Sequence, residues 1–418
     1  MSASRDEGYS VSPVTIRRTP EDFRVAERNT DAFHASLSRE CMASHPFAAF
    51  TLEKISLATP DALEFVAKRL RVPRTAVSAA GLKDRHAITT QVITVDTAAL
   101  HGSPPMHAED PAWRLTRLGF VPRAADSTII SRNAFTIVVR GLDKRQADEM
   151  VRRVDSLRTR DGVIAFVNYF GDQRFGSARH GKGFVGPALL AGDFEQALRL
   201  AIGTPARKDS GAVRSLTRAL ATYWGDWPRA LENFPRMPER ASIEVLARGG
   251  SFKEAFAALP KFTQEICIEA YQSHLWNSIA RELSGALAES MAQRCFEAED
   301  DYGALVFPRA AALTPAFRAL EIPMPSPRAQ MPECLSIIAE GVFADAGVTL
   351  ETMRIPGLSK PFFGGGARPF ISHAHEYSMS APTHDEFSSG GPNCLSCVVS
   401  FELPRGSYAT VLLRALGQ

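Results

Sequence analysis

The sequence has few cysteines and no long apolar run, and each shortage excludes a class of protein. Six cysteines are scattered over 418 residues, which argues against a disulfide scaffold and indicates a reducing compartment. No stretch stays apolar for the ~20 residues that a membrane span requires, and the first residues lack the apolar segment of a signal peptide. We therefore expect a cytoplasmic protein that has no contact with a membrane.

Sequence motifs for several common chemistries are also missing. The chain has no Gly-rich phosphate loop ending in Lys-Ser/Thr, no Gly-x-Gly-x-x-Gly after a strand and no Gly-x-Ser-x-Gly elbow. Cys394-x-x-Cys397 and His373-x-His375 lack further ligands at the spacing of a zinc site. Redox, nucleotide-driven and serine-hydrolase chemistry therefore have no support, and we expect no metal.

Little net charge is present. A formal charge of +2 gives no strong overall field, so any contact with a nucleic acid must come from a local basic patch. Hydrophobic residues make up 45% of the chain, which is enough to build the cores of two or three domains.

The order of the predicted elements indicates an α+β fold. Alternating apolar and polar residues predict strands at 19–27, 47–55, 89–95, 113–121 and 134–140. Thr59 is a candidate N-cap for a helix that ends near residue 70, and Asp143 for a helix with Ala147, Met150, Val151, Val154 and Leu157 facing inward. Strands and helices do not alternate strictly, so we expect no parallel doubly wound sheet.

The second half of the chain has a different character. Helical patterns dominate from about residue 185, at 193–202, 210–224, 240–248 and 262–283, and this change suggests an inserted domain. The stretches 308–332 and 357–391 are rich in proline, glycine and serine and are predicted to be loops. A last strand is predicted at 395–403, followed by a turn that exposes Tyr408.

Residues 80–91 (AGLKDRHAITTQ) hold one carboxylate between two cations. Lys83 and Arg85 flank Asp84 and would favour its ionised form, which suits a nucleophile or a base better than a proton donor. On this stretch alone, a solvated charge cluster on a turn is the simpler interpretation.

Several aromatic and amide side chains suit a cleft for nucleic acid, although each also has a structural explanation. Residues 168–176 (NYFGDQRFG) could stack on bases and read their edges, or form an aromatic strand that closes on a glycine turn. Asn133 and Phe135 share one face of a strand, where an aromatic ring usually packs inward. Tyr408 suits an interface as well as a ligand contact, and Gln272 and Asn277 on a predicted helix suit packing.

Taken together, these motifs resemble the TruD family of pseudouridine synthases through nearly the whole chain. The matching segments are PEDFRVAE (20–27), AGLKDRHAITTQ (80–91), NAF (133–135), NYFGDQRFG (168–176), YQSHLWN (271–277) and LPRGSYAT (403–410) with Arg414. The resemblance implies a pseudouridine synthase core, with a mixed and largely antiparallel sheet flanked by helices. The core would comprise residues 1–165 and 371–418, and a TRUD domain would be inserted at 166–370.

The resemblance also implies an activity and a set of site residues. The family isomerises uridine in RNA, in bacteria typically uridine 13 of a tRNA, without a cofactor, and Asp84 matches its catalytic aspartate. Asp84 would attack C1′ or remove a proton from C2′. The implied substrate contacts are Phe23, Asn133, Phe135 and Tyr408, with Lys83 and Arg174 as further binding residues. Arg17 stands where the family often has Lys and is expected to pair with Asp84.

Two other functions stay open at this point. The chain could be an RNA-binding module that does no chemistry, or a hydrolase that uses Asp84 with His86. The expected partner is RNA, in particular tRNA, and we expect a monomer.

Overall fold

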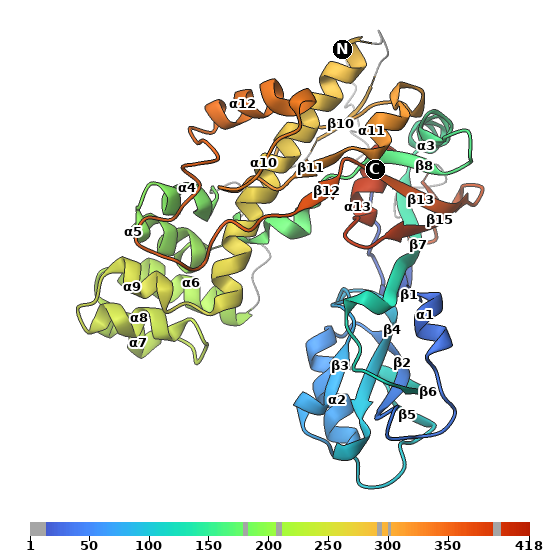
Figure 1. Ribbon diagram of the computed structural model, residues 1–418, viewed down its shortest axis with the longest axis horizontal. Coiled ribbons are helices and arrows are strands. Elements are labelled where there is room, and N and C mark those ends of the chain that lie inside the picture. Colours follow the sequence, from blue (N-terminus) through green and yellow to red (C-terminus); the bar gives the residue numbers. More distant parts are fainter. Residues whose placement is uncertain (1–13, 179–182, 206–210, 291–294, 300–301, 388–393) are drawn as a thin grey trace, which may run out of the picture. The chain divides into compact units, whose positions relative to one another are not determined.

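The computed structural model divides the chain into two compact units. It describes residues 14–178, 183–205, 211–290, 295–299, 302–387 and 394–418. One unit comprises Met1–Ala165 and Ser372–Gln418, and the other comprises Phe166–Ile371 (Figure 1).

The first unit is built on an 11-stranded sheet. Its strand order is β5-β6-β2-β4-β1-β7-β15-β13-β8, with β14 beside β15 and β3 beside β4. The strands are β1 (Phe23–Asn29), β2 (Phe47–Ile55), β3 (Val77–Ala79), β4 (Ile88–Asp96), β5 (His107–Asp110), β6 (Trp113–Val121), β7 (Ile130–Leu142), β8 (Ile164–Val167), β13 (Ile371–Met379), β14 (Thr383–His384) and β15 (Leu395–Pro404). Strand β1 runs parallel to β4 and antiparallel to β7, and β15 is antiparallel to β7. The expected α+β fold with a largely antiparallel sheet is confirmed.

The described helices of this unit are α1 (Asp31–Ala35), α2 (Thr59–Leu70), α3 (Lys144–Leu157) and α13 (Ala409–Ala415). Helix α2 lies beside β3 (Figure 1) and buries Leu63 and Val66 in a core that includes Phe50 and Leu115. Asp143 caps α3 as predicted, because its carboxylate accepts from the N–H of Gln146. The inward face predicted for α3 was wrong at one position, since Val151 is 48% exposed.

Two predicted element starts were wrong, and in both cases a side chain makes a different hydrogen bond. Residues Pro20–Asp22 form a 3₁₀ turn, because the Asp22 carboxylate accepts from the N–H groups of Arg18 and Thr19, and the strand begins at Phe23. The N-cap of α2 is Ala58, and the hydroxyl of Thr59 is used instead to hold the loop that carries Asp84.

The second unit is mostly helical. Its described helices are α4 (Val185–Leu190), α5 (Phe194–Leu198), α6 (Gly211–Tyr223), α7 (Trp227–Asn233), α8 (Arg240–Ala247), α9 (Phe252–Ala257), α10 (Lys261–Ser290), α11 (Pro315–Ala319) and α12 (Ser336–Asp345). The long helix α10 passes through this unit, and α4 to α9 lie toward one of its ends (Figure 1). Two small antiparallel sheets pair β9 (Phe296–Ala298) with β10 (Leu305–Phe307) and β11 (Glu321–Pro323) with β12 (Ala367–Pro369).

The loop prediction for residues 357–391 was wrong in part. Strands β12, β13 and β14 lie in this stretch, and β13 alone is nine residues long. The high proline, glycine and serine content at both ends of the stretch hid the strand pattern of residues 371–379. No helix in the described ranges is long and apolar enough to cross a membrane.

Candidate active site

One face of the sheet, where β1, β7 and β15 are neighbours, carries the predicted site residues Phe23, Asn133 and Phe135. In the β1–β7 register Val25 lies opposite Phe135 and Glu27 opposite Asn133, and Phe135 in turn lies opposite Phe401 of β15. Because side chains alternate along a strand, these residues point to the same side of the sheet. The loop between β3 and β4, which carries Asp84, contributes to this face through an ion pair with Glu27.

Asp84 forms an ion pair with Arg17. Nη2 of Arg17 lies 3.0 Å from Oδ2 of Asp84, and the two side chains are 29% and 33% exposed. The guanidinium of Arg17 also lies over the ring of Phe23, with its Cζ 4.3 Å from the ring centroid. The pairing of Arg17 with Asp84 that was expected from the sequence is present, and it leaves part of the carboxylate open to solvent.

Buried polar side chains hold the loop that carries Asp84 through hydrogen bonds to its main chain. The hydroxyl of Thr59 accepts from the N–H of Lys83 at 2.9 Å and donates to Oε1 of Gln91 at 3.0 Å. Nε2 of Gln91 donates to the carbonyl of Gly81 at 3.0 Å, and Nζ of Lys54 donates to the carbonyl of Asp84 at 2.9 Å. Thr59, Gln91 and Lys54 are each at most 1% exposed, so the main chain around Asp84 is fixed.

Lys83 does not face the carboxylate beside it in the sequence. Its Nζ lies 2.8 Å from Oε1 of Glu27, and the other oxygen of Glu27 accepts from the N–H of Val92 at 2.9 Å. The side chain of Lys83 is 10% exposed, and Arg85 is exposed. The cation in contact with Asp84 is therefore Arg17 rather than either sequence neighbour.

Three aromatic rings form a row on this face. The centroid of Phe135 lies 6.2 Å from that of Phe23, edge to face, and 5.4 Å from that of Phe401, nearly parallel at 26°. Phe23 and Phe401 are 1% and 2% exposed, whereas Phe135 is half-buried. Of these rings, Phe135 is therefore the one with surface available for a ligand, and Phe23 lies beneath Arg17.

The two remaining predicted contacts, Asn133 and Tyr408, lie on β7 and at the start of α13. Asn133 lies between Glu27 on β1 and Leu403 on β15, and its amide oxygen is buried without a hydrogen-bond donor among the described residues. Tyr408 is half-buried at the N-cap of α13, just after the turn that follows β15.

A buried charge cluster fixes the segment that carries Arg17. Arg140 donates from Nε to Oδ1 of Asp22 at 2.9 Å and from Nη1 to Oδ1 of Asp385 at 2.9 Å. The other oxygen of Asp22 accepts from the N–H groups of Arg18 and Thr19, at 3.0 and 3.1 Å. The main chain next to Arg17 is therefore tied, through Asp22, to Arg140 near the carboxyl end of β7.

Arg174 lies in the second unit, whereas the predicted site residues described above lie in the first. Its Nη2 lies 2.9 Å from Glu269, and its Nε donates to the hydroxyl of Ser273 at 3.3 Å. The aromatic residues of the motif 168–176 are buried, with Tyr169 0%, Phe170 7% and Phe175 1% exposed. In this structure they serve packing and present no stacking surface.

The packing interpretation of residues 271–277 is confirmed. Nε2 of Gln272 donates to the carbonyls of Pro325 and Gly364. Asn277 both donates to the carbonyl of Phe170 and accepts from its N–H. Both amides thus satisfy main-chain groups.

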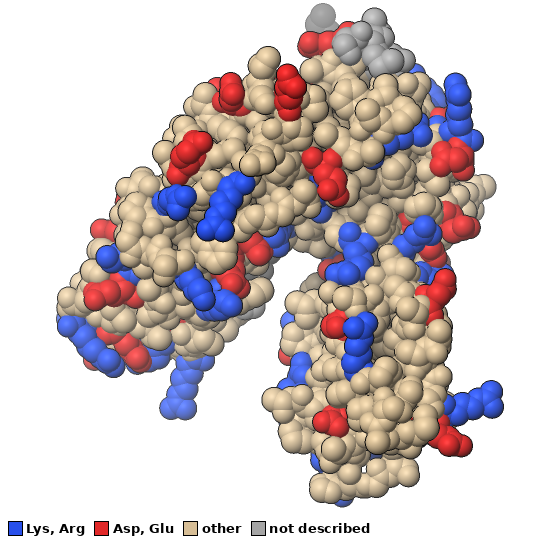
Figure 2. Space-filling model, viewed as in Figure 1, with Lys and Arg blue, Asp and Glu red and all other residues tan. Residues whose placement is uncertain are grey.

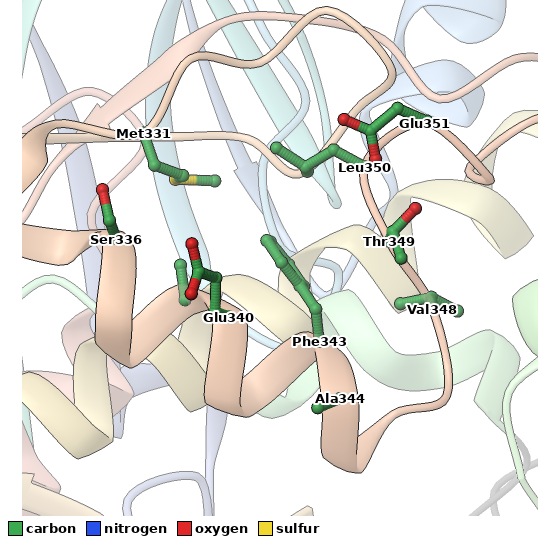
Figure 3. A pocket seen from close by; sticks show the side chains of 10 residues that line it. Met331, Ser336, Glu340, Phe343, Ala344, Val348, Thr349, Leu350 and Glu351 are labelled. Carbon is green, nitrogen blue, oxygen red and sulfur yellow. The ribbon is translucent and has the colours of Figure 1, made fainter.

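The second unit has a pocket of about 420 Å³ on α12 and the segment that follows it (Figure 3). Its lining residues are Met331, Ser336, Ala339, Glu340, Phe343, Ala344, Val348, Thr349, Leu350 and Glu351. It contains two carboxylates and no Lys or Arg, so it does not suit the phosphates of RNA. A pocket of about 380 Å³ in the first unit is lined in part by Phe33, Thr94 and Arg123, and no predicted site residue lines it.

Charge is mixed over the visible surface. On the face shown in Figure 2, Lys and Arg side chains are interspersed with Asp and Glu, in agreement with the formal charge of +2. Among the described residues, no group of three His, Cys, Asp or Glu side chains is placed to hold a metal ion.

Comparison with known proteins assigns the family. The family model described as tRNA pseudouridine synthase D (TruD) matches residues 11–416. The chain belongs to the TruD family. It is accordingly an RNA pseudouridine synthase, an isomerase, and the resemblance seen in the sequence motifs is confirmed.

Individual TruD relatives extend over most of the chain. "tRNA pseudouridine synthase D" of Aquifex aeolicus is 28% identical over 410 residues, which is 96% of this chain and 98% of the relative. "Probable tRNA pseudouridine synthase D 1" of Methanococcus maripaludis is 25% identical, again over 96% of this chain and 98% of its own length. The TruD crystal structure from Methanosarcina mazei aligns with a TM-score of 0.66 over 96% of this chain and 92% of that chain, at 22% identity. That last likeness concerns the fold.

Sequence reasoning overlooked several residues that surround this candidate site. Lys54 follows Phe50 and Leu52 at every second position of β2, so its side chain lies on the buried face of the strand. A lysine at such a position could have been recognised in the sequence as a candidate buried cation. Phe401 is likewise in phase with the apolar face of β15. No local pattern marks Arg140, because both of its carboxylate partners are distant in the chain.

Proposed function

We propose that the chain converts uridine 13 of a tRNA to pseudouridine, with Asp84 as the reacting carboxylate. The observation that carries this proposal is the Asp84 side chain, which is held by Arg17 and one-third exposed on the face that presents Phe135. The names of the relatives support tRNA as the substrate class. The target uridine would be flipped out of its stack, which costs a few kcal/mol.

In the proposed reaction the carboxylate of Asp84 either attacks C1′ of the flipped uridine or removes a proton from C2′. On either route the N1–C1′ bond breaks and its electron pair leaves with the uracil. The base turns and C5 bonds to C1′. In the same step the bond from Asp84 to C1′ breaks on the first route, or C2′ regains its proton from Asp84 on the second. The proton on C5 is then lost and N1 gains one, so the product has the mass of the substrate. Asp84 must begin as an anion, and the guanidinium of Arg17 at 3.0 Å favours that form.

The binding roles follow from the positions of the side chains. Phe135 would stack on the uracil, since it is the half-buried ring of the aromatic row. Asn133, with its unpartnered amide oxygen, would bond an edge of the base. Tyr408 would contact the nucleotide from the start of α13.

The other proposed binding residues act less directly. Phe23 would support Arg17 from below, and Lys83 would hold the loop through Glu27. Arg174 would bind RNA from the second unit, and it could do so only by sharing or leaving Glu269.

We assign residues 1–165 and 371–418 as the catalytic core and residues 166–370 as an inserted TRUD domain. The division of the structure into Met1–Ala165 with Ser372–Gln418 and Phe166–Ile371 supports these boundaries. Cytoplasmic location and a monomeric state stay predictions.

The test is Asp84→Asn, assayed with tRNA transcripts that carry tritium at C5 of uridine. Wild type should release tritium and form pseudouridine at position 13, and a transcript with cytidine there should stay unmodified. Asp84→Asn should release none while its tRNA affinity stays within about threefold of wild type, because a carboxylate does not contribute to binding the phosphates that dominate RNA affinity. Asp61→Asn, an exposed carboxylate on α2, is the matched control and should turn over normally.

The alternative functions predict different products. An RNA-binding module would bind the transcript and leave every uridine unmodified. A hydrolase using Asp84 with His86 would release free uracil or cleave the strand, and mass analysis would detect either product. Normal turnover by Asp84→Asn would overturn the proposed role of this residue.

A further inference from the structure

Lys54 is a buried cation directly beneath the loop of Asp84. Strand β2 turns Phe50, Leu52 and Lys54 to the same side, and all three side chains are 0% exposed. Nζ of Lys54 donates to the carbonyls of Leu57 at 2.6 Å and Asp84 at 2.9 Å. Among the described residues it forms no ion pair, so a charged amine lies in the core without a carboxylate in direct contact.

Burying a charged amine lowers the stability of the folded protein, so its presence in the core calls for an explanation. Removing an ammonium from water costs several kcal/mol, and an apolar residue in the same place would remove that cost. Burial lowers the pKa of Lys54 to about 8, the charge of Asp84 opposes this shift, and the charge of Lys83 adds to it. The carboxylate of Asp84 is thus the negative charge that raises the pKa of Lys54 and stabilises its charged form.

The other charged groups around Lys54 already have partners. Lys83 is paired with Glu27, and Arg17 reaches Asp84 from the outer side. Asp84 therefore lies between a cation in direct contact, Arg17, and a second cation that acts on it through the core, Lys54.

We propose that Lys54 is a positioning residue for the isomerisation, whose buried charge stabilises the anionic form of Asp84 while its hydrogen bond fixes the main chain there. This inference rests on the proposed function, because it assigns a role relative to the reacting carboxylate. The competing explanation is that Lys54 only holds the loop through its two hydrogen bonds.

The charge and the hydrogen bonds can be separated by pH. A neutral amine still has two N–H donors, so both carbonyls can stay bonded after Lys54 loses its proton. The positive charge is lost in the same step. If the charge matters, kcat/KM falls as pH rises through the titration of Lys54, and if only the hydrogen bonds matter, it does not.

Stability should change in the opposite direction over the same range. The pKa of Lys54 is about 8 in the folded chain against 10.5, the ordinary value for a lysine, so between these pH values only the unfolded state holds the proton. The unfolded state then binds more protons, and the free energy of unfolding rises with pH. A fall in kcat/KM together with a gain in stability excludes alkaline unfolding as the cause of the lost activity.

The experiment compares wild type with Lys54→Met and Lys54→Gln from about pH 6 to about pH 10, by tritium release from tRNA and by tRNA binding. Both variants should lower kcat about tenfold or more at neutral pH, with tRNA affinity within about twofold, because the lost interaction acts on the reacting group. The alkaline fall of wild type should be absent from both. Any fall that all three proteins share belongs to the substrate, since uridine also loses a proton in alkaline solution.

One further variant completes the design. Thr59→Val removes loop hydrogen bonds and no charge, so it should lower kcat but keep the alkaline fall of wild type. Lys54→Gln keeps a donor without the charge, and wild-type kcat in that variant would overturn the inference in favour of a purely structural lysine. An alkaline fall in Lys54→Met equal to that of wild type would overturn it as well. Failure of the proposed function would show separately, as activity in Asp84→Asn.

Discussion

Arg140 donates a 2.9 Å hydrogen bond to Asp385, a residue 245 positions later in the chain. The same guanidinium bonds Asp22, 118 positions earlier, and Asp22 holds the turn beside Arg17. Burial alone would lower the pKa of Arg140, but its hydrogen bonds to Asp22 and Asp385 raise that pKa above its ordinary value. One buried cation near the carboxyl end of β7 thus joins segments from near both ends of the chain.

Removing this cation should unfold the first unit far more easily. Arg140→Met leaves Asp22 and Asp385 buried without a counter-ion, and we expect it to lower the free energy of unfolding by about 3–5 kcal/mol. The matched control is Arg152→Met, which breaks a pair with Glu149 on the exposed side of α3 and should cost at most about 1 kcal/mol. Urea unfolding measures both, and equal losses would show that the cluster does not hold this unit together.

Arg17 should matter to turnover more than to folding. Arg17→Met removes a charge-assisted hydrogen bond worth about 1.5–3 kcal/mol, so we expect kcat/KM to fall about tenfold to a hundredfold. Arg17→Lys keeps the charge and should recover most of the activity, because a lysine ammonium can also pair with the carboxylate of Asp84. Arg18→Met changes the exposed neighbour and should stay within about twofold in the same tritium-release assay. A wild-type rate for Arg17→Met would remove Arg17 from the site.

The sequence predicted most elements of the first unit because their patterns are local. Strands β2 and β6 begin and end at the predicted residues, and α3 has its predicted cap at Asp143. Two of the errors, the starts of β1 and α2, arose where a polar side chain makes a hydrogen bond that its local pattern does not predict. Thr59 is a residue type that often caps helices, but its hydroxyl accepts a hydrogen bond from the main-chain N–H of Lys83, which is 24 residues away in the chain.

The sequence predicted which residues belong to the candidate site better than it predicted which of them are in contact. Asp84, Asn133 and Phe135 were recognised from motifs, and the pairing of Arg17 with Asp84 was expected. The motif also suggested that Lys83 would act on Asp84, but the chain turns Lys83 to Glu27. Residues that are adjacent in the sequence need not have side chains in contact at a turn. Lys83 pairs with Glu27 instead of Asp84 because the pairing of β1 with β4 brings Glu27 close to the loop.

Replacing Phe135 should affect tRNA binding, whereas replacing Phe401 should affect folding stability. Phe135→Ala should weaken tRNA binding by about 1–3 kcal/mol if the half-buried ring stacks on the uracil. Phe401→Ala empties a position that is 2% exposed and should instead lower the free energy of unfolding by about 3–5 kcal/mol. Binding titrations and urea unfolding on both variants provide the comparison. Loss of stability with unchanged binding in Phe135→Ala would assign Phe135 to the core.

His274 should make the second unit sensitive to acid. It lies on α10 with its ring centroid 4.6 Å from that of Phe184, and burial, with a smaller effect of Arg281, lowers its pKa to about 4. Between that value and 6.5, the value for an unperturbed His, only the unfolded state binds the proton. The free energy of unfolding should therefore fall as pH drops from about 6.5 to about 4, by at most about 1.4 kcal/mol per pH unit from this group.

His274→Phe tests this dependence, because phenylalanine keeps the ring contact with Phe184 and cannot take a proton. Urea unfolding of wild type and variant is followed by the fluorescence of Trp276, which is 0% exposed on the same helix, together with that of the other tryptophans. The difference in stability between the two proteins should grow in favour of the variant as pH falls through this window, and stay constant above it. A difference that does not change with pH would mean that His274 titrates alike in the folded and unfolded chain.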